Sequence, residues 1–320
     1  MTAYINAVAA WLPEKIETTE DLIRENPDWN AARIVSKTGI HSRHLASSGE
    51  LTSNLAVAAA RALMENHHIA ADSIDHLIVC TQTPDHLIPS CACRVQHALG
   101  MPTRTAAFDI NMGCSGYIYG LQVAAALVNA GAARRVLLIN ADTYSKLLAA
   151  DDLATRTLFG DGATASLISA DPTGAAIGAI VLGTDGAGYD GFVARNSALA
   201  DDGDQSRRIR MDGPAIFNFT LERVPALVKE FLANNQLEQA DIAQFVFHQA
   251  NAWMLDHLRK KIGIDASRFP LIMGDIGNTV SASIPMVLAS LKDRLKPGDK
   301  LVLVGFGVGL SWGISLLTWQ

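Results

Sequence analysis

Short apolar runs typical of β-strands alternate along the chain with apolar and polar positions spaced as in amphipathic helices. In the first half, this pattern predicts strands near residues 5–12, 76–81, 107–110, 136–140 and 163–168, and helices near 53–66, 89–99 and 116–130. In the second half, it predicts strands near 176–182, 244–247, 301–304 and 311–317, and helices near 214–234, 254–262 and 281–291. The alternation indicates an α/β protein with a largely parallel sheet.

Two pairs of segments resemble each other at nearly the same offset and in the same order. They are residues 71–80 with 240–248, and residues 135–139 with 300–304. This agreement predicts an internal duplication with two related halves, 1–170 and 171–320. The period is far too long for a solenoid repeat. A segment rich in Asp, Gly and Ser at 197–208 is expected to form a surface loop.

The 320-residue chain is long enough for about two domains or one large α/β unit, and its 49% hydrophobic content suits a large core. A net charge of −6 argues against a nucleic-acid partner, because nucleic-acid-binding surfaces are usually basic. Neither a long apolar run nor a signal peptide is evident, so we expect no membrane partner and a cytoplasmic location. Cys91 and Cys93 are too close for an ordinary disulfide and lack partner ligands, which favours a reducing compartment and no metal.

Cys114 is the first candidate catalytic residue. It follows the strand-like run 106–110 after a short turn and precedes the apolar helical pattern 116–128. Unpaired N–H groups and the helix dipole stabilise a thiolate at a helix N-terminus, so a cysteine here can act as a nucleophile. The alternative is that Cys114 is a small buried hydrophobic residue, as most free cysteines are.

Two polar positions in the second half can act together with this thiol. His248 ends a predicted strand, and Asn278 lies in a turn before a predicted helix. Taken singly, such residues are more often a hydrogen-bonded structural histidine and a turn or helix-capping asparagine. However, the duplication aligns the strand of His248 with a first-half strand, and ligand sites in open α/β sheets lie beyond the carboxyl ends of strands. We therefore expect the three side chains to converge.

Alternating glycines between the last two predicted strands indicate a tight hairpin with close backbone contacts. These glycines are Gly305, Gly307 and Gly309. The simple interpretation is a hairpin alone, and the functional one is a backbone N–H aimed at a developing oxyanion. Another glycine-rich turn, at 159–163, lacks the spacing and the lysine of nucleotide-phosphate loops, which excludes that class of site.

Taken together, Cys114, His248 in a His-Gln-Ala-Asn motif and Asn278 in a Gly-Asn-Thr motif resemble the triad of the β-ketoacyl-acyl-carrier-protein synthase III family. These are the initiating condensing enzymes of the thiolase superfamily. Further matching motifs occur in the family's order at 38–44, at 159–163 and at the closing Trp-Gly pair 312–313, so the resemblance covers nearly the whole chain. It implies an α/β, thiolase-like fold with five layers, α-β-α-β-α, built from two duplicated halves.

The resemblance also implies a two-step reaction. Cys114 takes an acyl group from an acyl thioester, and malonyl-acyl carrier protein (ACP) then loses CO₂, so that its enolate attacks the acyl-enzyme to give a β-ketoacyl thioester. His248 and Asn278 would donate hydrogen bonds to the enolate oxygen. The backbone N–H groups of Cys114 and Val308 would form the oxyanion hole for the acyl group. No cofactor or metal is implied, and the expected partners are ACP, the acyl thioester and a second copy of the chain in a homodimer.

The chain departs from the family's usual pattern at the expected substrate entrance. Val308 occupies a position that is commonly glycine, and a valine requires a negative φ there. Typical bacterial members hold the adenine of coenzyme A (CoA) between a tryptophan and an arginine, but those positions hold Arg33 and Leu153. A usually basic position after the His-Gln-Ala-Asn motif holds Trp253. The acyl donor therefore either is carried by ACP or has its CoA bound differently.

Two further sets of residues receive roles from the resemblance or from charge. Leu87 and Ile88 are expected to close the acyl pocket of the neighbouring subunit. Arg259, Lys260 and Lys261 form a basic cluster that can dock an acidic carrier protein, although a solvated helical face is the usual meaning of such a cluster.

Four other functions compete with this one. A papain-like cysteine hydrolase shares the order Cys, His, Asn but lacks that family's local cysteine signature, and it leaves the duplication unexplained. An α/β-hydrolase elbow would need glycine where this chain has Met112. A same-fold acyltransferase, moving the acyl group to an alcohol or amine without decarboxylation, often replaces the Cys or the Asn, and both are present here. The intact triad also argues against an inactive partner subunit of a heteromeric synthase.

Overall fold

The computed structural model describes residues 2–200 and 208–320. Within these residues, one mixed sheet has the strand order β11-β12-β13-β8-β1-β7-β6-β4-β5. Its strands are β1 (Tyr4–Trp11), β4 (His76–Cys80), β5 (Ala106–Ile110), β6 (Arg135–Asp142), β7 (Gly162–Ser169), β8 (Ala175–Thr184), β11 (Ile242–Phe247), β12 (Lys300–Gly307) and β13 (Ser311–Trp319).

The sheet consists of two blocks that meet at β1 and β8. These two strands share only the pairs Tyr4 with Ala176 and Ile5 with Ala175. The prediction of a largely parallel sheet is wrong, since only β4–β5, β4–β6 and β11–β12 are parallel. The hairpin β12–β13 has to be antiparallel because a short turn cannot join parallel neighbours.

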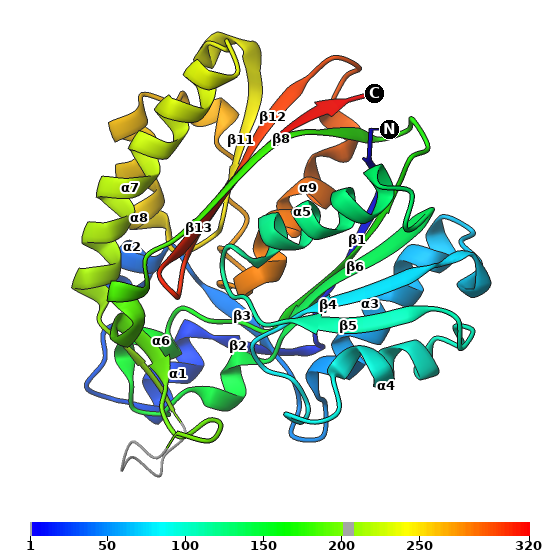
Figure 1. Cartoon of the computed structure of the whole chain (residues 1–320). Helices are drawn as coiled ribbons and strands as arrows, with labels where there is room; N and C mark the ends of the chain where they lie inside the picture. Colours follow the sequence, from blue (N-terminus) through cyan, green and yellow to red (C-terminus); the bar gives the residue numbers. More distant parts are fainter. Residues whose placement is uncertain (1, 201–207) are drawn as a thin grey trace.

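Helices cover both blocks and fill the space between them (Figure 1). They are α3 (Thr52–Asn66), α4 (Cys91–Ala98), α5 (Gly116–Asn129), α7 (Gly213–Asn234), α8 (Ala252–Ile262) and α9 (Ser283–Leu291). α5 and α9 pack against strands of both blocks, whereas α3 and α4 cover the outer face of the first block and α7 and α8 that of the second. The arrangement confirms the predicted five layers, α-β-α-β-α.

The position of α5 explains its sequence. A helix with one solvated face shows a polar stripe, but α5 lies between two layers of strands and is apolar nearly all round. Gly120 lets it approach β6, because a Cβ there would lie 2.7 Å from Cδ1 of Leu138.

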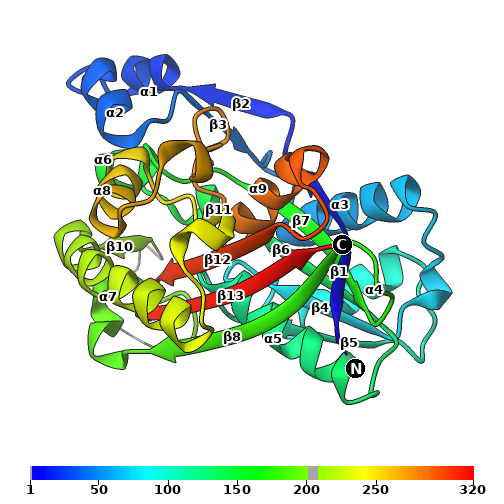
Figure 2. The same cartoon turned by 90° about the horizontal axis from the view of Figure 1, so that it is seen from above.

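A smaller layer at one end was not predicted from the sequence. It contains the ribbon β2 (Lys15–Thr18) and β3 (Ser42–Leu45), the helices α1 (Thr19–Glu25), α2 (Ala31–Thr38) and α6 (Leu153–Arg156), and the ribbon β9 (Phe192–Ala194) and β10 (Ile209–Met211). Figure 2 shows α1 and α2 beside α6 and α8. Most of the predicted surface loop 197–208, namely residues 201–207, lies outside the described residues.

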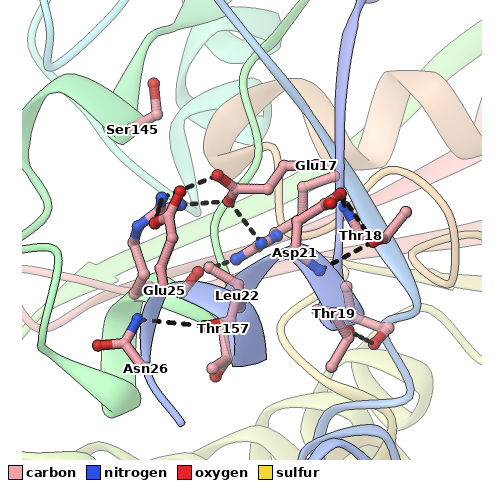
Figure 3. Close-up of polar contacts among 12 residues, drawn as sticks. Glu17, Thr18, Thr19, Asp21, Leu22, Glu25, Asn26, Ser145 and Thr157 are labelled. Atoms are coloured by element: carbon pink, nitrogen blue, oxygen red, sulfur yellow. Dashed lines mark hydrogen bonds and ion pairs between the residues drawn. The ribbon is translucent and has the colours of Figure 1, made fainter.

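A buried ion network joins this layer to the rest of the molecule. The carboxylate of Glu17 accepts hydrogen bonds from Arg43, at 2.7 Å, and from Arg156, with Glu25 close by (Figure 3). Arg43 is only 1% exposed. It packs closely on Gly277, where an added Cβ would lie only 2.7 Å from Cγ of Arg43. The network therefore supports the turn that leads to Asn278.

The elements follow a similar order on either side of the connection between β7 and β8. The first series is β1-α3-β4-α4-β5-α5-β6-β7, and the second is β8-α7-β11-α8-α9-β12-β13, with no described strand in the place of β5. The division into halves 1–170 and 171–320 stays a prediction that agrees with this order. In the described part of the chain, no helix is long and apolar enough to cross a membrane.

Candidate active site

Cys114 lies between β5 and α5, two residues before the helix begins, and is 8% exposed. Burial raises the pKa of its thiol to about 12, while the backbone N–H groups of Val308 and Cys114, which face the sulfur, oppose the rise. The N–H of Cys114 lowers the pKa in the direction expected at a helix N-terminus, but this effect is smaller than that of burial. Removal from water outweighs the two N–H groups, and the sulfur stays protonated.

The predicted glycine hairpin is present and brings its backbone against the cysteine. A Cβ at Gly307 would lie 2.9 Å from Cβ and 3.1 Å from Sγ of Cys114, and one at Gly305 would lie 2.8 Å from Cα of Ser115. Only glycine lets the hairpin backbone come this close without displacing Cys114 or Ser115. Val308, at the turn itself, is not among the residues with a positive φ, as its branched side chain requires.

His248 follows β11 and is 2% exposed. Its Nδ1 lies 2.8 Å from Oγ of Ser283, which also accepts the backbone N–H of Gln249 at 3.3 Å. Its Nε2 lies 3.5 Å from Nδ2 of Asn278. Burial lowers the pKa of the imidazole to about 3, so His248 is neutral at physiological pH.

Asn278 is held by backbone hydrogen bonds on both sides. Its N–H donates to Leu158 O at 2.8 Å, and its carbonyl accepts from the N–H of Gly160 at 3.0 Å. Its side-chain Oδ1 accepts the N–H of Val280 at 2.9 Å, which leaves Nδ2 directed toward His248. Val280 has a φ of +56°, a costly conformation for a β-branched residue, and such strain is concentrated at functional sites.

Cys114, His248, Asn278 and Val308 border the same cavity, of about 160 Å³. The rest of its wall is mainly apolar, including Phe159, Phe192, Met211, Ile216, Phe217, Trp253 and Phe306. The first and second halves of the chain thus supply different groups to one site. A thiol, two side-chain N–H donors and a backbone N–H in an apolar chamber can form and stabilise an acyl thioester and an enolate.

A second cavity, of about 430 Å³, adjoins the first at Trp253. Arg33 and Leu153, the two positions of the expected adenine clamp, both line it, together with Lys37. Trp253 stacks on Phe217, with ring centroids 4.6 Å apart, and Nζ of Lys37 lies 5.0 Å from its ring. Trp253 therefore stands between an outer vestibule and the cysteine chamber.

The remaining candidates lie away from the chamber. Leu87 and Ile88 are 63% and 88% exposed and border no described cavity that contains Cys114. Arg259, Lys260 and Lys261 lie in the last turn of α8, whereas Trp253 lies in its first.

The charge of this basic turn is partly neutralised. Arg259 and Lys260 both pair with Asp256, and Lys261 donates to Leu221 O at 2.9 Å.

Several residues of the site were not found by sequence reasoning. Tyr144, Phe159 and Phe192 form an aromatic cluster beside Cys114, with ring centroids 5.1–6.3 Å apart. Nothing in their local sequence marks them as neighbours. Asp142 could have been noticed, because a charged residue comes only three positions after the apolar run 136–139.

Asp142 is fully buried, and among the described residues its carboxylate accepts hydrogen bonds only from uncharged groups. Its Oδ1 accepts the N–H of Gln82 at 2.8 Å and the hydroxyls of Thr81 and Thr83, and its Oδ2 accepts the hydroxyl of Ser281 at 3.2 Å. Burial raises the pKa of this carboxyl to about 7. Among residues 2–200 and 208–320, no three His, Cys, Asp or Glu side chains form a group that could hold a metal ion.

Comparisons with known proteins show which family the chain belongs to. Residues 108–186 match the family model described as 3-Oxoacyl-[acyl-carrier-protein (ACP)] synthase III. Residues 232–319 match a second model, described as the C terminal of the same synthase. The chain is 38% identical to Beta-ketoacyl-[acyl-carrier-protein] synthase III of Rhodospirillum centenum, over 100% of this chain and 99% of that protein.

Solved structures show the same relationship. A 3-oxoacyl-(acyl-carrier-protein) synthase III is 40% identical, with a TM-score of 0.95 and full coverage of both chains. The synthase III of Thermus thermophilus is 36% identical, with a TM-score of 0.92 and 99% of each chain covered. The chain therefore belongs to the β-ketoacyl-acyl-carrier-protein synthase III family.

Proposed function

We propose that Cys114 carries the acyl group of an initiating condensation. The observation behind this proposal is that Cys114, His248, Asn278 and the N–H of Val308 border one buried apolar cavity. As a member of its family, the chain is a transferase-class condensing enzyme, and the proposal assigns the parts of that reaction to particular residues. Acyl transfer without decarboxylation has no observation in its favour.

In the first step, the sulfur of Cys114 attacks an acyl thioester. The S–C bond to the cysteine forms, the bond to the donor's sulfur breaks, and the donor thiol leaves with the proton that Cys114 loses. The tetrahedral oxyanion would accept hydrogen bonds from the N–H groups of Cys114 and Val308, which already face the sulfur. Because the resting thiol has a pKa of about 12, stabilising this oxyanion matters more than storing a thiolate.

In the second step, malonyl-ACP loses CO₂, and the resulting enolate carbon forms a C–C bond to the acyl carbonyl. The C–S bond to Cys114 then breaks, and the released sulfur takes a proton from water to restore the thiol. A neutral His248 can donate from Nε2 if its proton resides there. The contacts of Ser283 permit that tautomer, since its Oγ can donate to Nδ1 of His248 while it accepts from the N–H of Gln249. Nδ2 of Asn278 is the second donor to the enolate oxygen.

The proposed partners are an acyl thioester, ACP and a second copy of the chain, and no cofactor takes part. The acyl donor can be CoA-bound or ACP-bound, because the vestibule contains the cations Arg33 and Lys37 but lacks the usual adenine clamp. The exposed Leu87 and Ile88 suit a contact with a second copy, whose acyl pocket they would help to close.

The test is intact-mass analysis of the protein with a panel of acyl-CoAs and acyl-ACPs. We expect one acyl mass on the wild type and none on Cys114→Ala, followed by a β-ketoacyl product when malonyl-ACP is added. An acyl mass that persists on Cys114→Ala would contradict the assignment.

A further inference from the structure

Three oxygen atoms form a buried chain next to Cys114. Oγ of Ser115 lies 2.7 Å from Oγ of Ser311, and Oγ of Ser311 lies 2.7 Å from the carbonyl oxygen of Val308. Ser115 is 0% and Ser311 2% exposed. A carbonyl can only accept, so the hydroxyl of Ser311 donates to Val308 and that of Ser115 donates to Ser311.

This chain of hydrogen bonds joins the two sides of the site. Ser115 directly follows Cys114 at the N-terminus of α5, and Ser311 is the first residue of β13. The two serines are 196 positions apart, one in each half of the chain. The contact therefore ties the hairpin turn to the segment that carries the nucleophile.

The turn needs this restraint because its glycines leave the backbone free to rotate. Gly307 and Gly309 flank Val308 with φ values of +151° and +135°, and glycine leaves the neighbouring peptide planes freer to rotate than any other residue does. The N–H of Val308 has to face the sulfur of Cys114 to act on an oxyanion, and glycine alone cannot hold it there. The hydrogen bond fixes the peptide plane between Val308 and Gly309, so that only φ and ψ of Val308 separate this fixed plane from the one that carries the Val308 N–H.

We propose that Ser311, supported by Ser115, is a positioning residue that holds the Val308 N–H toward the oxyanion formed at Cys114. The proposal rests on the proposed function only in taking Cys114 as the acylated residue. The competing interpretation is that the two serines merely stabilise the hairpin, in which case they would affect every reaction of Cys114 alike or none.

Two chemical probes separate these possibilities without a biological acyl donor. With p-nitrophenyl acetate, the S–C bond forms through a tetrahedral oxyanion, the C–O bond breaks, p-nitrophenolate leaves and the thiol proton passes to water. With iodoacetamide, the sulfur displaces iodide directly, and no oxyanion forms. Both rates are read from the mass of the peptide that contains Cys114.

We expect Ser311→Ala to slow acetylation by p-nitrophenyl acetate by about tenfold to a hundredfold, less than the loss of a whole oxyanion donor. Alkylation by iodoacetamide should stay within twofold of the wild-type rate. Ser311→Thr, which keeps the hydroxyl, should restore acetylation, and Ser115→Ala should give a smaller loss of a few-fold because one hydrogen bond to Val308 remains.

Equal acetylation by the wild type and Ser311→Ala would overturn the proposal, and so would parallel losses in both reactions. If Ser311→Ala does not fold, Ser115→Ala gives the same comparison with a smaller expected loss, and Ser311→Thr serves as its control. Failure of the proposed function has a different result, since the wild type would then react with p-nitrophenyl acetate but with none of the acyl-CoAs or acyl-ACPs.

Discussion

At the level of single residues, burial decides how this site can react. It keeps the Cys114 sulfur protonated and His248 neutral, and it leaves the oxyanion and enolate donors in an environment from which water is largely absent. Hydrogen bonds to a developing charge are worth more in such a site than in water. Hydrogen bonds from Val280 to Asn278 and between Ser283 and His248 orient these donors.

Replacing Asn278 should affect only the second of the two proposed steps. Asn278→Ala should leave acylation of Cys114 within about twofold of wild type, because this amide faces the enolate and the acylation oxyanion has other donors. Decarboxylation of malonyl-ACP should fall by about 10²–10³, the usual effect of losing one such donor. The two steps can be measured by intact mass and by release of labelled CO₂. Condensation at nearly the wild-type rate in this variant would instead favour acyl transfer without decarboxylation.

At the level of secondary structure, α8 has two different ends. Its first turn holds Trp253 at the boundary of the vestibule and the cysteine chamber, and its last turn holds the basic cluster. The cluster follows Trp253 by six to eight residues, a rise of about 9–12 Å along the helix, so it lies about two turns from the entrance. A carrier protein that used both ends would have to lie along the helix.

Reversing the charge of Lys260 tests whether the last turn of α8 docks ACP. The side chain is 67% exposed and pairs with Asp256. If the last turn of α8 docks ACP, Lys260→Glu should raise the KM for malonyl-ACP about threefold to tenfold, less so at high salt, and leave acylation by an acyl-CoA unchanged. Lys292→Glu, at an exposed position outside α8, is the matched control. Equal KM values for both variants and the wild type would exclude this dock.

At the level of the whole molecule, periodicity predicted the main strands and helices, because buried strands and sandwiched helices have long apolar runs. The five layers were implied by the family resemblance, and the duplication agrees with them. The small end layer was missed, since its ribbons are four residues or shorter and its helices eight or shorter. Cys114, His248 and Asn278 could be predicted to converge because each lies at the end of an apolar element. The Ser115–Ser311 pair and the Tyr144 cluster could not, because contacts between distant segments leave no local signal.

Asp142 joins the two halves and gives the molecule a pH dependence that can be measured. Its carboxylate binds Ser281 of the second half, and its pKa is about 7 in the fold against 3.8 as an ordinary aspartate. Between these values the folded protein keeps a proton that the unfolded chain has released, so this group makes stability fall as pH rises from about 4 to 7.

Asp142→Asn should remove this pH dependence of stability, because the side-chain amide is uncharged. Its Oδ1 can accept the N–H of Gln82, and its Nδ2 can donate to the hydroxyl of Ser281. The free energy of unfolding of the variant, relative to wild type, should therefore rise with pH across this window by up to about 1.4 kcal/mol per unit. Urea unfolding at pH 5, 6, 7 and 8 measures the difference, and the other titrating groups cancel because both proteins share them. Parallel pH profiles would mean that Asp142 ionises normally and that water or another donor compensates its burial.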